Sequence, residues 1–126
     1  MGLIYTDIIL SNPTRPDLRP VSVHAMADRG AVTLCIPEHV ASQLQLPYVE
    51  QREVTVGDGH VHTVPYVGPL RIQFDNRSCF SGALVLGDEP LLGAIQMGDM
   101  DLILNPHDGL ITINPQSPNI ASAKVK

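Results

Sequence analysis

The sequence ADRGAV, residues 27–32, decides how the rest of this chain is interpreted. It places an acidic residue, Asp28, and a glycine shortly after it at the end of an apolar run, residues 21–27, that predicts a strand. Glycine lets the backbone come close to the carboxylate, and the N–H groups of such a tight loop can hold that carboxylate in its ionised form. A catalytic acid is presented in this way, but so are the acids of many ordinary strand-to-turn corners. Other features of the sequence are needed to tell a catalytic acid from the acid of an ordinary turn.

The composition is that of one globular domain, residues 1–126. Hydrophobic residues make up 44% of the chain, and eleven prolines and ten glycines favour many short strands and turns over long helices. The net charge is −5 and no basic cluster occurs, so neither nucleic acid nor an anionic membrane is expected as a partner. No apolar stretch approaches the ~18 residues of a membrane span, and no signal peptide is expected, because no charged-then-apolar leader precedes the first predicted strand.

The cysteines and the first residues bear on the location of the protein. Cys35 and Cys79 lie among apolar residues; one disulfide is possible by count, but two buried free thiols in a reducing compartment are favoured. A cytoplasmic location is therefore expected. Met1-Gly2 with Thr6 fits an acylation pattern, but no second membrane signal accompanies it and residues 3–10 predict a strand that the fold needs.

The spacing of apolar residues, prolines and glycines predicts an all-β domain with one short helix. The helix is expected to begin at Pro37, because proline suits the first helical position, and to end at Pro47. Gly57-Asp58-Gly59 predicts a hairpin. Residues 79–86 are nearly all apolar and are expected to be buried on both faces, and residues 114–126 form a polar, extended tail. The predicted strands are residues 3–10, 21–27, 32–35, 50–56, 60–67, 70–74, 79–86, 101–104 and 110–113, with a helical turn through Met97 and Met100.

Other arrangements that carry chemistry are weak in this sequence. His60 and His62 share one face of a predicted strand beside Asp58, but no third metal ligand accompanies them, so no metal is expected. No Gly-x-Ser-x-Gly elbow or glycine-rich phosphate loop occurs, and the sequence places neither a histidine nor a helix N-terminus beside Cys35. No cofactor is expected. The acids of the later turns are interpreted as solvated; they are Asp88, Glu89, Asp99 and Asp101.

Three features follow one another in an informative order. An Asp-x-Gly loop follows an apolar strand, a Gly-Asp-Gly hairpin comes about thirty residues later, and a Leu-Leu-Gly segment lies beyond a predicted buried strand. In this order the chain resembles the retropepsin-like aspartic peptidases, the retroviral-type half-size relatives of pepsin, and among them the bacterial members of that clan. The resemblance covers nearly the whole chain. Residues 25–31 stand where the family has an apolar run followed by Asp-Thr/Ser-Gly-Ala, residues 53–67 resemble its flap hairpin, and residues 83–87 and 91–94 resemble the segments that pass beside its active-site loop.

The resemblance implies a retropepsin-like closed β-barrel, the acid protease fold, with a flap hairpin and one short helix. It implies an aspartic endopeptidase that acts as a homodimer, since each chain supplies one catalytic aspartate, Asp28, and the reaction needs two. Two carboxylates that lie so close together share a proton. One can then accept a proton from a water molecule while the other donates to the peptide carbonyl, without a metal or a covalent intermediate. The substrate is expected to be a peptide or protein segment held extended between loop and flap, with apolar residues beside the scissile bond.

The resemblance also assigns individual residues. Arg29, Gly30 and Ala31 belong to the active-site loop, and the flap and the substrate-binding walls comprise Val56, Gly57, Asp58, Gly59, Val61, Leu91, Leu92 and Gly93. One of these positions departs from the family: Arg29 stands where the family has Thr or Ser, whose hydroxyl forms a hydrogen bond across the two-fold axis. Arginine has no acceptor, is far longer and brings a permanent charge. The alternative is therefore a catalytically impaired protein of the same fold that binds a peptide or protein partner without turnover.

Overall fold

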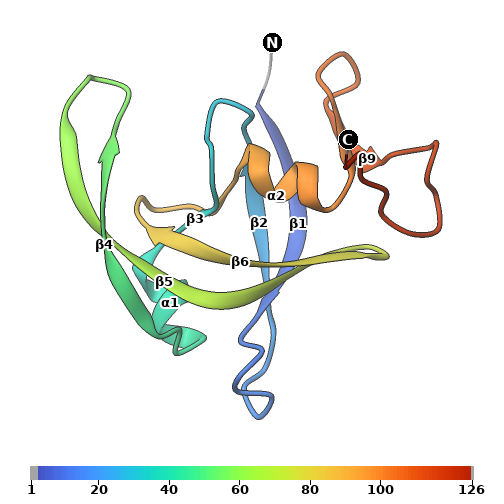
Figure 1. The fold of residues 1–126 in the computed structure, drawn as a ribbon. Coiled ribbons are helices and arrows are strands. Elements are labelled where there is room, and N and C mark those ends of the chain that lie inside the picture. Colours follow the sequence, from blue (N-terminus) through green and yellow to red (C-terminus); the bar gives the residue numbers. More distant parts are fainter. Residues whose placement is uncertain (1–2, 126) are drawn as a thin grey trace.

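The structure, a computed structural model, describes residues 3–125 and is mostly β (Figure 1). Its strands are β1 (Ile4–Ser11), β2 (Val21–Ala27), β3 (Cys35–Ile36), β4 (Tyr48–Thr55), β5 (Val61–Phe74), β6 (Arg77–Val85), β7 (Leu91–Leu92), β8 (Leu102–Asn105) and β9 (Leu110–Ile113). Its helices are α1 (Glu38–Gln43) and α2 (Ala94–Asp99). The predominance of strands is thus confirmed, with two short helices instead of the one expected.

The second helix, α2, forms where the sequence predicted only a helical turn. The backbone N–H groups of Ala94 and Ile95 donate to the carbonyls of Ala31 and Val32 at 2.8 and 3.0 Å. These bonds satisfy two of the N–H groups that every helix start leaves without an intrahelical partner. A contact between distant segments therefore completes this short helix, and local sequence does not show such a contact.

Seven strands form one mixed sheet in the order β1-β2-β7-β3-β6-β5-β4, and an additional pairing of β1 with β5 bends it into a ring. β4 stays outside this ring, and the β4–β5 hairpin extends as an arm at one side of the molecule (Figure 1). Two neighbouring pairs are parallel, β2 with β7 and β3 with β6. The pairing of β2 with β7 brings the end of an early strand beside a segment that lies far along the chain.

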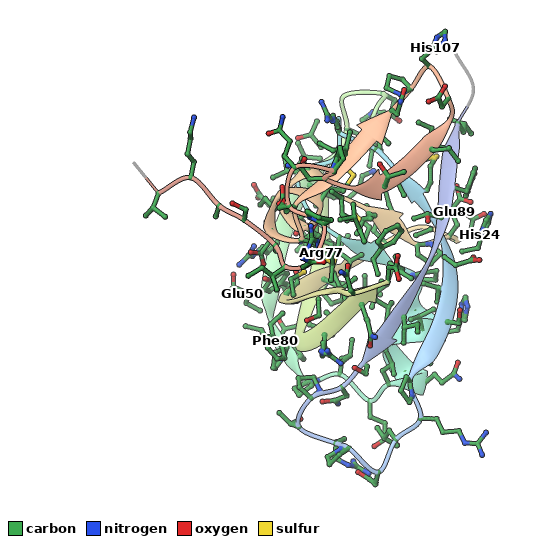
Figure 2. All side chains as sticks on the ribbon, turned by 90° about the vertical axis from the view of Figure 1, so that its right-hand side faces the viewer. His24, Glu50, Arg77, Phe80, Glu89 and His107 are labelled. Carbon is green, nitrogen blue, oxygen red and sulfur yellow. The ribbon has the colours of Figure 1, made fainter. Side chains whose placement is uncertain are left out.

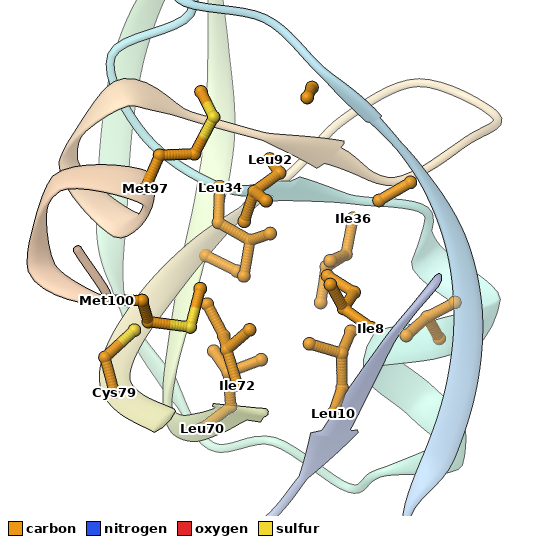
Figure 3. Close-up of a cluster of buried hydrophobic side chains, with 14 of the residues drawn as sticks. Ile8, Leu10, Leu34, Ile36, Leu70, Ile72, Cys79, Leu92, Met97 and Met100 are labelled. Atoms are coloured by element: carbon orange, nitrogen blue, oxygen red, sulfur yellow. The ribbon is translucent and has the colours of Figure 1, made fainter. Parts of the chain in front are cut away.

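The hydrophobic core lies between the strands of the ring (Figure 3). Alternation along the strands produces it: Leu70 and Ile72 of β5 are fully buried, whereas Arg71 and Gln73 are only half-buried, as the sequence predicted. Each such Leu or Ile contributes about 1.5–3 kcal/mol on burial. The fully buried apolar side chains come from four strands, from the residue that directly follows each helix and from the segment before β3; they include Ile8, Leu10, Leu34, Ile36, Leu44, Leu70, Ile72, Leu92 and Met100.

Four of the predicted strands differ clearly in extent or in burial. The strand expected at residues 32–35 is limited to the two residues of β3, and Val32 is 68% exposed. The strands expected at 60–67 and 70–74 are one continuous strand, β5, with a register shift between Val67 and Leu70 against β6. The expectation that residues 79–86 are buried on both faces is wrong, because Phe80 of β6 is 66% exposed. Its antiparallel pairing with β5 leaves one face of this part of β6 in solvent.

The C-terminal part leaves the ring as a separate hairpin, β8–β9. The tail after Ile113, which the sequence predicted to be extended, contains no helix or strand up to residue 125. Among residues 3–125, neither helix is long and apolar enough to cross a membrane. Met1 and Gly2, which carry the acylation pattern, lie outside the described residues, and Thr6 lies within β1.

Candidate active site

Asp28 directly follows β2, in a loop that backbone hydrogen bonds hold from both sides. Its own N–H donates to the carbonyl of Leu92 at 3.1 Å, and its carbonyl accepts the N–H of Ala31 at 3.1 Å. Its carboxylate oxygen Oδ1 accepts the N–H of Gly30 at 2.8 Å. A Cβ at Gly30 would lie 3.0 Å from the same oxygen, so a larger residue there would crowd the carboxylate. The glycine of ADRGAV thus brings a backbone donor to the acid, as the sequence predicted.

The segment after Asp28 crosses the segment after β7 at very short range. A Cβ at Gly93 would lie 2.6 to 2.7 Å from three backbone atoms of Thr33, closer than real Cβ contacts come. The helix-starting bonds from Ala94 and Ile95 to the carbonyls of Ala31 and Val32 lie beside this contact. Gly93 is therefore the residue that allows the Asp28 loop and the start of α2 to lie against each other.

A buried amide, Gln96 of α2, adds a side-chain link at the same crossing. Its Nε2 donates to the hydroxyls of Thr33 and Ser81, both at 2.9 Å, and only 2% of the residue is exposed. It ties the Asp28 loop to β6. Sequence reasoning missed Gln96, because a glutamine between apolar residues carries no sign of its distant partners; the sequence predicted only a helical turn through Met97 and Met100.

The β4–β5 hairpin provides the wall opposite the Asp28 loop. At its tip the N–H of Gly59 donates to the carbonyl of Val56 at 2.9 Å, with Gly59 at a φ of 87° that favours glycine. The carboxylate of Asp58 accepts the backbone N–H of His60 at 2.9 Å and contacts its Nδ1 at 2.8 Å. These hydrogen bonds lower the pKa of the Asp58 carboxyl group below its usual value. The predicted Gly-Asp-Gly hairpin is confirmed.

A cleft of about 750 Å³ lies between the Asp28 loop and this hairpin. The predicted site residues that line it are Asp28, Gly30, Ala31, Val56, Gly57 and Leu91. Further lining residues were not assigned individually from the sequence, although residues 53–55, 84 and 86 lie in the segments that the resemblance placed at the site; they are Val32, Thr33, Cys35, Arg52, Glu53, Val54, Thr55, Leu84 and Leu86. Its apolar part coincides with a small cluster around Cys35, Val64 and Leu84. The cleft thus combines a carboxylate with an apolar wall.

The other predicted site residues do not line the cleft. Arg29 is exposed, Asp58 and Gly59 lie at the hairpin tip beyond it, and Val61 is 60% exposed. Leu92 and Gly93 are buried behind it, and they act on the loop through backbone contacts instead. The structure therefore brings together about half of the predicted set around the Asp28 carboxylate.

Neither cysteine is placed for nucleophilic chemistry. Both are free and buried, as the sequence favoured, and burial raises the pKa of the Cys35 thiol at the cleft. Burial, with a smaller contribution from Asp99, raises the pKa of Cys79 to about 12. Both thiols therefore stay protonated at neutral pH.

The interpretation of Asp101 as a solvated acid is wrong. Its Oδ1 accepts the amide of Asn114 at 3.0 Å, and its Oδ2 accepts the hydroxyl of Ser117 and the N–H of Ser122, the latter at 3.0 Å. Figure 2 shows Arg77 in the middle of the molecule. Its side chain is 1% exposed, and its Nη2 lies 3.9 Å from Oδ2 of Asp101. These donors, Ser117 first, lower the pKa of Asp101 to about 2. The tail residues that supply them are distant in sequence, which is why the local pattern predicted nothing of this site.

The other contacts between ionisable groups are small and lie at the surface. Among residues 3–125, no three His, Cys, Asp or Glu side chains are grouped so that they could hold a metal ion. His24 stacks on Tyr5 and contacts Asp7 at 2.9 Å, while the Tyr5 hydroxyl donates to Glu89 at 3.2 Å.

Comparison of the sequence with protein-family models and with curated proteins finds no match.

Proposed function

We propose that this chain is one half of a homodimeric, retropepsin-like aspartic endopeptidase in which Asp28 activates a water molecule for peptide-bond hydrolysis. The observation that carries the proposal is the position of the Asp28 carboxylate. It lies in a cleft whose other wall is a long hairpin, and one of its oxygens is held by the N–H of Gly30. A half-size acid protease domain requires such a loop, together with a flap above it.

The details of the Asp28 site support this chemistry. Within residues 3–125 no basic side chain forms an ion pair with Asp28, so its carboxylate stays available to a ligand. Two such carboxylates, one from each chain, would share a proton: one accepts a proton from the attacking water while the other donates to the carbonyl oxygen of the substrate. The ring-like sheet, the buried Leu92-Gly93 segment behind the loop and the hairpin arm are also consistent with a closed acid protease fold.

Arg29 favours a second candidate, a protein of this fold that binds a peptide or protein partner without turnover. Arg29 lacks the hydroxyl that braces the loops of the family across the two-fold axis, and two such cations near one axis would repel each other. In the single chain Arg29 is exposed and lies outside the lining of the cleft. This placement is compatible with a dyad that forms despite the arginine.

Cleavage of an unfolded protein from acidic to neutral pH tests the first function, with a statine-type transition-state mimic as inhibitor. Asp28→Asn is expected to lower the rate at least about a hundredfold, because the amide can neither accept the proton of the water nor share one. Asp99→Asn, at an exposed acid that does not line the cleft, is the matched control and keeps its activity. If wild type and Arg29→Thr cleave nothing while both bind peptides, the second candidate is correct.

Sedimentation at micromolar concentration tests the homodimer, since one Asp-x-Gly loop per chain cannot form a dyad. The wild type is expected at twice the mass of the chain. Arg29→Thr removes two cations from the axis and adds two hydrogen bonds of about 1 kcal/mol each, so it should tighten association about tenfold or more. Monomeric protein that cleaves peptides through Asp28 would contradict the mechanism.

A further inference from the structure

Among the described residues that line the cleft, Arg52 of β4 is the one basic residue. Asp28 and Glu53 are the acids of the same lining, and the chain as a whole carries a net charge of −5. Among the residues that line the cleft, only Arg52 would therefore attract an acidic group of a ligand. Where Arg52 sits, and what holds it, decides whether that position is part of the cleft's selectivity.

The guanidinium of Arg52 is held in place by two neighbours. Its central carbon lies 3.7 Å from the centroid of the Tyr66 ring, which is a cation–π arrangement. Its Nε donates to Oε2 of Glu50 at 2.9 Å, and Figure 2 shows Glu50 at the edge of the molecule. Tyr66 in turn needs Gly82, because a Cβ there would lie 2.1 Å from the Tyr66 hydroxyl oxygen. The side chain is thus pre-organised, although it is 46% exposed.

These contacts use Nε and the face of the guanidinium, so its two terminal nitrogens, Nη1 and Nη2, can bind another group. Within residues 3–125 no acceptor is hydrogen-bonded to Nη1 or Nη2 of Arg52. The paired N–H groups of such a fork match the two oxygens of a carboxylate. Arg52 can therefore bind a carboxylate without giving up Glu50 or Tyr66.

The position of Arg52 on β4 sets the spacing of a ligand that it would bind. Side chains alternate along a strand, so Arg52 and Val54 share one face of β4, about 7 Å apart. Val54 packs against the apolar cluster of Cys35, Val64 and Leu84 in the cleft. An extended peptide has the same two-residue spacing on each of its faces. One of its side chains can then meet the apolar wall while the next on that face meets Arg52.

We propose that Arg52 determines the specificity of this cleft and selects peptides that carry an aspartate or glutamate two residues from an apolar side chain. The inference rests on the proposed function in one respect, namely that an extended peptide occupies the cleft. It names the substrate class, acidic-apolar segments, and it requires no catalytic step.

Equilibrium binding of short fluorescent peptides tests this role. The probes are Thr-Thr-Leu-Thr-Asp-Thr-Thr, its reversed sequence, and both peptides with Asn in place of Asp; the protein is the full chain carrying Asp28→Asn, so that bound peptide is not consumed. In at least one order the Asp peptide is expected to bind about fivefold tighter than the Asn peptide at low salt, with the ratio falling as salt is raised.

Two arginine variants, made in the same Asp28→Asn chain, show whether Arg52 causes the preference. Arg52→Met keeps the apolar stem and should bring the ratio to about one. Arg71→Met is the matched control, because Arg71 also lies on a strand but contacts Gln73 and does not line the cleft; it should keep the ratio. The proposal is overturned if no peptide binds, if both peptides bind alike, or if Arg52→Met keeps the preference.

Cleavage of the same peptides by the wild type separates this inference from the proposed function. A wild type that cleaves them without an acidic preference upholds the peptidase and overturns the role of Arg52. A preference that depends on Arg52, without any cleavage, upholds Arg52 and contradicts the peptidase.

Discussion

Two aspartates of this chain, Asp28 and Asp101, each lie in a turn just beyond a strand or helix, but their carboxylates have very different hydrogen-bond partners. Asp28 accepts one backbone N–H and faces a cleft. Asp101 uses both oxygens on donors from the C-terminal segment, with Arg77 close by. An acid whose acceptor capacity is used up by the protein stabilises the fold, whereas an acid with spare capacity at a cleft can act on a ligand. The hydrogen-bond partners of an acid therefore indicate, better than its local sequence does, whether it stabilises the fold or can act on a ligand.

The largest expected effect comes from disturbing the Asp28 region without touching its acid. Gly93→Ala would place a Cβ against the backbone of Thr33, and neither backbone can move without disrupting the crossing. The free energy of unfolding is expected to fall by about 3 kcal/mol or more, or the protein fails to fold. Denaturant unfolding measures it.

Gly98→Ala is the matched control for this change, because Gly98 lies in α2, the helix that begins after Gly93, with nothing within 4 Å of its Cβ position. It should stabilise the protein by about 0.5–1 kcal/mol through helix propensity. Equal losses in the two variants would show that the close crossing of Gly93 and Thr33 does not exist.

An intermediate effect is expected at Asp101, and it should depend on pH. Because the folded-state pKa of about 2 lies below the usual value of 3.8, the Asp101 carboxylate stabilises the fold above that usual value, and the contribution is lost as pH falls towards 2. Asp101→Asn should therefore destabilise the protein at neutral pH. The difference from wild type should shrink between about pH 4 and about pH 2 in urea unfolding series.

Asp99→Asn provides the control for Asp101, since Asp99 is an exposed neighbour. Its unfolding curve should follow that of the wild type through the same acidic range. A pH-independent difference for Asp101→Asn would mean that the carboxylate charge is not what holds the tail.

The smallest effect on stability is expected at Asp28 itself. Asp28→Asn keeps an oxygen that can accept the N–H of Gly30, so the free energy of unfolding should change by no more than about 0.5 kcal/mol. Unfolding under the conditions used for Asp101→Asn gives the direct comparison. A loss as large as that of Asp101→Asn would make Asp28 a structural acid and remove the basis of the proposed function.

Much of the local structure could be predicted because it depends on local physics. β2 has the predicted bounds, the Gly-Asp-Gly turn joins two paired strands, and Gly30 donates to the acid beside it. What failed depends on distant partners: the exposure of Phe80, the helix at Ala94–Asp99 and the hydrogen-bonded role of Asp101. The candidate site was predicted in part, since Arg52 in the cleft and Gln96 behind the Asp28 loop carry no local signal and gain their roles from the elements packed against them.

The strand-rich character of this protein, its hairpin arm and its acid–glycine loop follow from local sequence, because alternation, turn residues and the freedom of glycine act over a few neighbouring residues. Which acid keeps carboxylate oxygens that can still accept a hydrogen bond depends on the tertiary structure. The parallel pairing of β2 with β7 and the crossing of Thr33 with Gly93 place Asp28 at an open cleft, whereas the returning tail covers Asp101. Such pairings join residues far apart in the chain, and their free energy comes from packing and hydrogen bonds that no local pattern contains.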